Sequence, residues 1–63
     1  MPVITVDIGI LHNRESKAEL VKALTKAASI TTEIPEDKFI VLINELERDN
    51  IGVGGRLLSD VSK

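Results

Sequence analysis

The sequence predicts an α/β (α+β) fold in which one βαβ unit with parallel strands is followed by a C-terminal turn or hairpin. Two apolar segments rich in β-branched residues, residues 2–8 and 38–46, flank one amphipathic segment, residues 14–32. A strand, a long helix and a second strand in this order form a right-handed crossover with parallel strands in nearly all cases. We therefore expect a single domain that covers residues 1–63.

The first strand is expected from Pro2 to Ile8. Its residues alternate with the two-residue period of a strand and favour β-branched types. A proline in first position costs little, because no ladder donor is needed there. One face carries Ile4, Val6 and Ile8, and the other carries Val3, Thr5 and Asp7.

The helix is expected from Arg14 to about Thr32, after a loop that ends near His12. Asn13 is a suitable N-cap, and the apolar positions recur at three- and four-residue spacing along one face. We expect the helix to end at Ile34–Pro35, because the residue before a proline is disfavoured in helical geometry. The apolar positions are Leu20, Val21, Leu24, Ala27 and Ala28.

The second strand is expected from Lys38 to Leu46. Its centre, FIVLI at residues 39–43, is apolar at every position, as in strands that are covered on both faces. One helix covers one face only, so a second subunit is expected on the other. The tail DNIGVGGRLLSD places three glycines within four positions before two leucines, which predicts a turn or small hairpin ending in an apolar patch that docks on a neighbour.

The composition favours self-association. A chain of 63 residues buries only about 60% of the surface that its unfolded form exposes, so a single core is marginal. The chain has no cysteine and one histidine, so neither a disulfide nor a zinc cage can stabilise it, and we expect no metal site. With 43% hydrophobic residues, the surplus apolar surface is expected at the interfaces of a homo-oligomer.

Charge and aromatic content argue against a nucleic-acid partner, because the net charge is -2 and Phe39 is the one aromatic residue. The longest apolar run, Phe39–Ile43, is far shorter than the roughly 20 residues that span a bilayer, and no signal-peptide pattern is present. We expect a cytoplasmic protein without a membrane partner.

Few side chains suit catalysis. His12 is either an acid or base, since imidazole titrates near neutrality, or a solvated loop residue. The glycines of the tail match neither common phosphate-loop pattern, so a turn with positive φ explains them better. Glu45 and Glu47 fit a solvated strand edge better than a carboxylate pair, and no nucleophile set of the Ser/His/Asp or Cys/His kind can be assembled.

The first two residues offer a different kind of group. Methionine before a small residue is commonly removed by methionine aminopeptidase, which would leave Pro2 with a free secondary amine at the tip of the first strand. An α-amino group has an ordinary pKa of about 8, and an apolar pocket or a neighbouring cation lowers it. Pro2 is therefore either the harmless start of a strand or a general base suited to neutral pH.

The chain as a whole resembles 4-oxalocrotonate tautomerase and its small relatives. The resemblance rests on five features: Pro2 after the initiator methionine, the strand PVITVDI, the helix opening RESKAELVKALTKAA, the strand FIVLINEL and the glycine turn NIGVGG. Their order and spacing cover essentially the entire chain.

The resemblance implies a βαβ fold assembled as a homohexamer, a trimer of dimers, in which paired protomers form a four-stranded sheet. It also implies an active site at each processed N-terminus, with Pro2 as general base and no cofactor. The implied reaction is an isomerisation: the prolyl nitrogen takes a proton from a 2-hydroxydienoate, or another enol of a 2-keto acid, and returns it to a carbon to give the conjugated ketone.

The resemblance implies substrate-binding roles at four further positions. Family members have an arginine in the loop after the first strand, and the corresponding residue here is His12, with Arg14 as the nearest guanidinium. They have a second arginine early in the second strand, and the corresponding residue here is Ile40. An aromatic wall before the glycine turn corresponds to Ile51. Because a lost oxyanion donor costs roughly a hundredfold to a thousandfold in rate, we expect weak turnover of a dicarboxylate such as 2-hydroxymuconate and a preference for a monoacid or more apolar enol.

Several alternatives stay open. Arg14, Arg48 and Arg56 are candidates to supply a cation from another direction, including across a subunit interface, and each is otherwise a solvated surface arginine. Related chemistry would make Pro2 the acid of a hydratase, dehalogenase or decarboxylase. In a non-catalytic oligomeric module Met1 would be retained, and Pro2 would be a tertiary amide without a basic lone pair.

Overall fold

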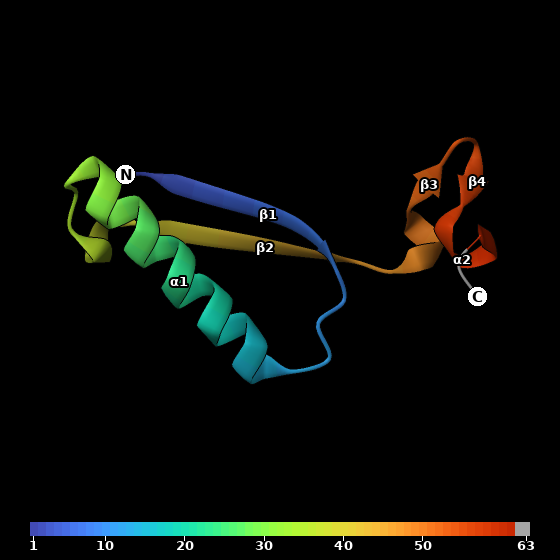
Figure 1. The fold of residues 1–63 in the computed structure, drawn as a ribbon, viewed down its shortest axis with the longest axis horizontal. Helices are drawn as coiled ribbons and strands as arrows, with labels where there is room; N and C mark the ends of the chain where they lie inside the picture. Colours follow the sequence, from blue (N-terminus) through green and yellow to red (C-terminus); the bar gives the residue numbers. More distant parts are fainter. Residues whose placement is uncertain (62–63) are drawn as a thin grey trace.

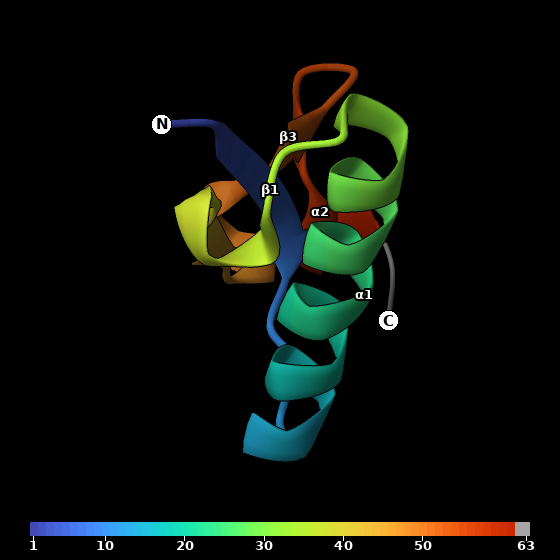
Figure 2. The same cartoon turned by 90° about the vertical axis from the view of Figure 1, so that its left-hand side faces the viewer.

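Strands β1 (Val3–Gly9) and β2 (Ile40–Leu46) form a parallel pair joined by helix α1 (Arg14–Thr32) in a computed structural model that describes residues 1–61. The register pairs Val3 with Ile40 and Gly9 with Leu46. Helix α1 runs along one face of this two-stranded sheet (Figures 1 and 2). The predicted βαβ unit with parallel strands is confirmed.

Helix α1 begins at the predicted cap. The Asn13 side-chain oxygen accepts the backbone N–H of Glu15 at 2.7 Å and that of Ser16 at 3.2 Å, which satisfies two of the donors that a helix start leaves open. Within residues 1–61 no helix is both long and apolar enough to cross a membrane.

The helix ends at Thr32, as predicted, two residues before Ile34–Pro35. Glu33 adopts the left-handed conformation, with φ 61°, and its N–H donates to the Ser29 carbonyl at 2.8 Å. A left-handed residue of this kind closes a helix and satisfies a terminal carbonyl. The local conformation of Glu33, rather than the proline, therefore ends the helix.

Both strand boundaries differ slightly from the prediction. β1 starts at Val3 rather than Pro2, whose carbonyl accepts the Ile40 N–H at 3.0 Å and which has no N–H of its own to give. β2 starts at Ile40 rather than Lys38, because Glu36–Lys38 form a 3₁₀ turn, η1. Pro2 and Ile40 are thereby fixed side by side at one end of the sheet.

After β2 the chain forms a separate C-terminal arm, residues 48–61. It consists of a 3₁₀ turn η2 (Arg48–Asn50), the antiparallel strands β3 (Gly52–Val53) and β4 (Arg56–Leu57), and a short helix α2 (Leu58–Val61). The predicted hairpin is confirmed, with its turn at two glycines of φ 61° and 83°, whereas α2 was not predicted. Figure 1 shows the arm extending beyond the end of β2, away from α1.

The two faces of the sheet differ in cover. On the face toward α1, side chains such as Ile4 and Ile43 are half-buried, and no described residue is fully buried. On the opposite face Val3 is 51% exposed and Leu42 is 50% exposed, with Ile40 and Leu46 also exposed beside them. The sequence therefore places apolar residues on a face that this chain alone leaves open to water.

The dimensions of the chain agree with this incomplete burial. Its radius of gyration is 14.9 Å, whereas a compact domain of this length has about 11 Å. Its accessible surface is 4983 Å², whereas a folded monomer of this mass exposes about 4000 Å². The difference of about 1000 Å² is comparable to what one partner contributes to a standard protein interface.

Candidate active site

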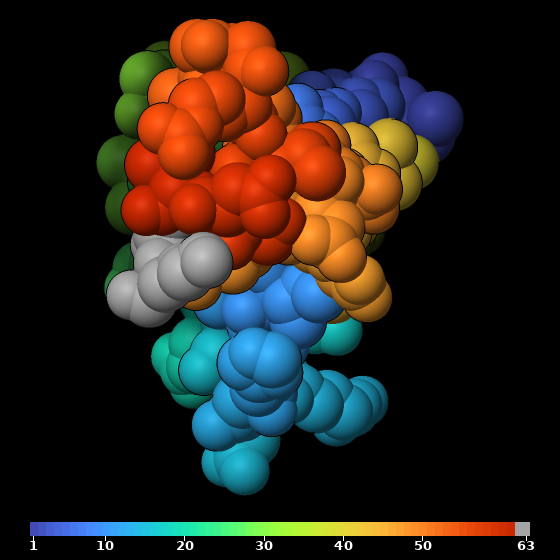
Figure 3. Space-filling model, turned by 90° about the vertical axis from the view of Figure 1, so that its right-hand side faces the viewer, coloured from blue at the N-terminus to red at the C-terminus, as the bar shows by residue number. Residues whose placement is uncertain are grey.

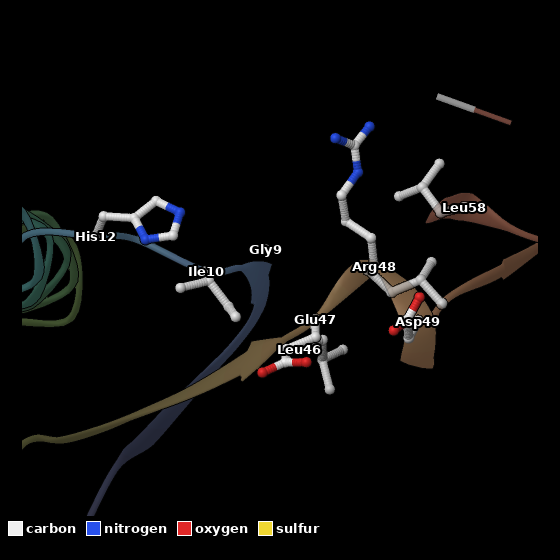
Figure 4. Close-up of a pocket in the computed structure, with 9 residues that line it drawn as sticks. Gly9, Ile10, His12, Leu46, Glu47, Arg48, Asp49 and Leu58 are labelled. Atoms are coloured by element: carbon white, nitrogen blue, oxygen red, sulfur yellow. The ribbon is translucent and has the colours of Figure 1, made fainter. Parts of the chain in front are cut away.

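A cavity of about 580 Å³ opens at the end of the sheet where both strands finish (Figure 4). The carboxyl ends of parallel strands lie at one edge of a sheet, so the loops that follow β1 and β2 face each other there. The first loop contributes residues 9, 10 and 12, the second contributes residues 46–49 and 51, and Leu58 lies on the side of the arm.

Much of the cavity wall is aliphatic. Since the arm turns back after β4, Leu58 of α2 comes to lie near the end of β2, and its N–H donates to the Ile51 carbonyl at 2.7 Å. This bond fixes α2 to the turn that follows β2. The aliphatic lining residues are Ile10, Leu46, Ile51 and Leu58.

Four charged or titratable side chains complete the lining: His12, Glu47, Arg48 and Asp49. In Figure 4 the His12 ring and the Arg48 guanidinium lie on one side of the chain that leaves β2, and the carboxylates of Glu47 and Asp49 lie toward the other side. The face of the cavity between His12 and Arg48 therefore suits an anionic group.

Glu45 ties the first loop to the sheet and the helix. One carboxylate oxygen accepts the Leu11 N–H at 2.7 Å, and the other forms an ion pair with the Lys17 ammonium at 2.5 Å. The interpretation of Glu45 as a solvated edge residue was wrong, because its side chain points to the helix side of β2. Since His12 follows Leu11, this carboxylate fixes the backbone position of His12.

The same contacts set the protonation state of Glu45. They hold its pKa below the ordinary value, chiefly because Lys17 donates a hydrogen bond to the carboxylate and secondly because the Leu11 N–H does so. Desolvation raises the pKa, but less than these bonds lower it. The carboxylate is therefore ionised at neutral pH and available to both donors.

The residues that the sequence suggested for a site fall into three places. His12 and Ile51 line the cavity. Pro2 and Ile40 lie together at the opposite end of the sheet, and β1 between them and the cavity is about 20 Å long at 3.3 Å per residue. Arg14, at the start of α1, lies beside Lys17 in a separate shallow hollow.

One chain therefore places the residues that the sequence suggested for a site at two opposite ends of the sheet. The cavity has a guanidinium, an imidazole and an aliphatic wall, and the proline lies at the far end of the sheet. Within residues 1–61 no three histidine, cysteine or acidic side chains gather as metal ligands would.

Sequence reasoning did not find the Glu45–Lys17 pair, the contribution of Leu58, or the cavity position of Arg48. The signal for Arg48 was present, because residues that directly follow parallel strands share one sheet edge. The other two depend on the angle of α1 across the sheet and on the path of the arm. Periodicity specifies neither.

A parallel βαβ unit with an open apolar sheet face and a cavity at the strand ends defines a small α/β protein built for association. The chain matches the model of the family described as tautomerase enzyme over residues 2–61. It is 38% identical over 61 residues to a 2-hydroxymuconate tautomerase of Bacillus subtilis, an alignment that covers 97% of this chain and 98% of that protein.

Solved structures agree with the sequence match. The crystal structure of YwhB, a homologue of 4-oxalocrotonate tautomerase, superimposes with a TM-score of 0.86 at 37% identity, covering 94% of this chain and 97% of that one. A heterohexameric 4-oxalocrotonate tautomerase from Chloroflexus aurantiacus gives a TM-score of 0.86 at 26% identity, covering 97% and 98%. The chain belongs to the tautomerase family and is an isomerase.

Replacement of Glu45 tests its role in fixing the first loop. Because its folded-state pKa is lowered, its contribution to stability is present above the unfolded pKa of about 4.3 and is lost as pH falls through the folded value. We expect Glu45→Ala to lower the urea midpoint at pH 7 and to approach the wild-type midpoint at an acid pH below the folded-state pKa of Glu45. Glu45→Gln keeps an acceptor for Leu11 and should fall between them.

The matched control is Glu47→Ala, two residues along and exposed, which should leave the midpoint near the wild-type value at both pH values. Measurements at one protein concentration keep any association constant. Equal midpoints for Glu45→Ala and the wild type at pH 7 would contradict the role given to Glu45.

Proposed function

We propose that the chain is a cofactor-independent tautomerase that converts 2-hydroxydienoates, or related enols of 2-keto acids, into conjugated ketones. The observation that carries this proposal is membership of the tautomerase family from residue 2 onward, with a proline at that residue directly after a methionine. The Bacillus subtilis relative is named for a reaction of the same class. The general base is the Pro2 nitrogen, freed by removal of Met1.

The reaction requires one base that accepts a proton from the substrate and later returns that proton to another atom of the substrate. The Pro2 nitrogen accepts the proton of the 2-hydroxyl group, and the electron pair of that O–H bond forms the carbonyl at C2. The double bonds shift along the chain, and a carbon at the far end of the conjugated system receives the proton from the prolyl ammonium. No electrons or atoms are gained or lost overall.

The surroundings of Pro2 suit this role. Met1 is 89% exposed, so an aminopeptidase can reach it, whereas Pro2 is half-buried beside Ile40. Removing Met1 would leave the amine at an apolar end of the sheet. Apolar cover disfavours the protonated amine and lowers its pKa toward neutrality, where a general base is most effective.

Pro2 and the cavity can meet only between subunits. Both strands of the sheet have a free edge, and a two-fold axis normal to the sheet pairs identical edges in antiparallel fashion. Pairing along β1 would give a four-stranded sheet and would place Pro2 of one protomer at the end of β1 in its partner, where the cavity opens. Pairing along β2 would leave Pro2 on an outer strand.

We propose a homohexamer built as a trimer of such dimers. The open sheet face with Val3, Leu42 and Leu46 supplies apolar area for the contacts between dimers. A heterohexamer is the state named for the Chloroflexus aurantiacus neighbour, which has the same fold.

Blocking the amine tests the role of Pro2 most simply. An extra lysine inserted between Met1 and Pro2 prevents removal of the methionine and turns the proline nitrogen into a tertiary amide. We expect enol-to-ketone conversion, followed by ultraviolet absorbance, to fall by about a hundredfold to ten-thousandfold, since this is what a general base contributes.

The control variant has an alanine inserted between Met1 and Pro2. Its methionine can be removed, which leaves the primary amine of this alanine as the N-terminus, one residue before Pro2. Intact-mass analysis establishes which N-terminus each protein has. Full turnover by the lysine variant with its methionine retained would remove Pro2 from the mechanism, and a wild-type rate that falls as pH rises would replace base catalysis by acid catalysis.

Ile40→Arg tests why a dicarboxylate should be a poor substrate. Ile40 is exposed on the open face at the same end of the sheet as Pro2, so a guanidinium there can reach an anion bound near the amine. We expect kcat/KM for 2-hydroxymuconate to rise about tenfold or more, as one charge-assisted hydrogen bond provides, with little change for the monoacid 2-hydroxypenta-2,4-dienoate.

Ile40→Gln has a similar length and polarity without the charge and should give no such gain. Light scattering shows whether each variant keeps the wild-type assembly. An equal gain in both variants, or none with arginine in an intact assembly, would contradict an electrostatic explanation for the substrate preference.

A further inference from the structure

We propose that Arg48 binds the substrate carboxylate, and that the cavity it shares with His12 selects enols with one carboxylate and an apolar remainder. This inference rests on the proposed tautomerase function and names the substrate class of its site. It follows from the placement of Arg48, the direction of its side chain and the character of the walls around it.

The placement of the arginines distinguishes them. Of the three in the chain, Arg48 lines the cavity, whereas Arg14 lies in the hollow beside Lys17 and Arg56 belongs to β4 of the arm. His12 is the other side chain with nitrogen donors among the lining residues. Arg48 is therefore the guanidinium that a ligand in this cavity would meet.

The backbone around Arg48 is held by a hydrogen-bonded turn. The Ile51 N–H donates to the Arg48 carbonyl at 3.3 Å, and the Asn50 N–H donates to the Glu47 carbonyl at 2.8 Å. The turn follows β2 directly, and Ile51 is in turn bonded to Leu58 of the arm. The backbone on both sides of Arg48 is thus held in one hydrogen-bonded turn.

The side chain is directed toward the hollow. In Figure 4 the Arg48 guanidinium lies between His12 and Leu58. Figure 3 shows the arm and the end of β2 packed together above the loop that follows β1. The guanidinium can therefore face a ligand that enters between the two loops.

The chemistry of the lining defines the ligand. A guanidinium offers parallel N–H donors that match a carboxylate, and His12 can add another donor. The aliphatic residues Ile10, Leu46 and Ile51 suit a hydrocarbon chain, and the volume of about 580 Å³ suits a small molecule. Because Ile40 gives the far end no cation, a second carboxylate would have no matching donor there.

Sorbate, a dienoate without a 2-hydroxyl group, tests the binding step separately from turnover, and sorbamide is its uncharged analogue. We expect the wild type to bind sorbate more tightly than sorbamide in titration calorimetry. Arg48→Gln should raise the Kd for sorbate by about tenfold to a hundredfold, as loss of a charge-assisted bond does. The Kd for sorbamide should change less than about twofold.

Arg48→Lys should recover part of the affinity, and Arg56→Gln, on exposed β4, is the matched control that should leave both ligands unchanged. A Kd for sorbate within about twofold of the wild type in Arg48→Gln would overturn the inference, as would equal losses for sorbate and sorbamide. If sorbate binding depends on Arg48 but no enol is turned over, the carboxylate site stands and the proposed function fails.

Discussion

The open apolar face of the β1–β2 sheet is the constraint on which the rest of the structure depends. Helix α1 covers one face, and the other exposes Val3, Ile40, Leu42 and Leu46 to water. Burying apolar surface of this kind contributes about 25 cal/mol per Å². Coverage of about 800 Å² by a partner would therefore contribute roughly 20 kcal/mol before the costs of association. In the homo-oligomer that we propose, one contact would supply both stability and a complete site to a chain with so little interior.

Division of the site between the two ends of the sheet follows from the parallel topology. Parallel strands place all their N-termini at one end of the sheet and all their C-termini at the opposite end. Pro2 and Ile40 lie at the end where the strands start, and the cavity with His12 and Arg48 lies at the end where they finish. The antiparallel pairing that we propose would bring these two ends together, and the Glu45 contacts hold the loop that follows β1 in place.

The sequence was sufficient for the fold because its signals are local. Alternation, helical periodicity, the Asn13 cap and the glycine turn each act over a few residues, and the crossover rule then determines the topology. The candidate site was harder to predict. Ile40 depended on a family resemblance, which also favoured Pro2 as a base, and the role of Glu45 depends on its hydrogen bond to Leu11, 34 positions earlier in the chain. Such contacts follow from packing angles that residue periodicity does not encode.

Subunit complementation tests most directly whether the site forms between chains. One variant has a lysine between Met1 and Pro2, and the other combines His12→Ala with Arg48→Gln. If Pro2 of one protomer serves the cavity of its partner, co-refolding equal amounts of the two inactive proteins should restore about a quarter of the wild-type activity, because half of randomly formed pairs are mixed and each mixed pair has one intact site. Activity no greater than the sum of the two separate variants would contradict a site shared between subunits.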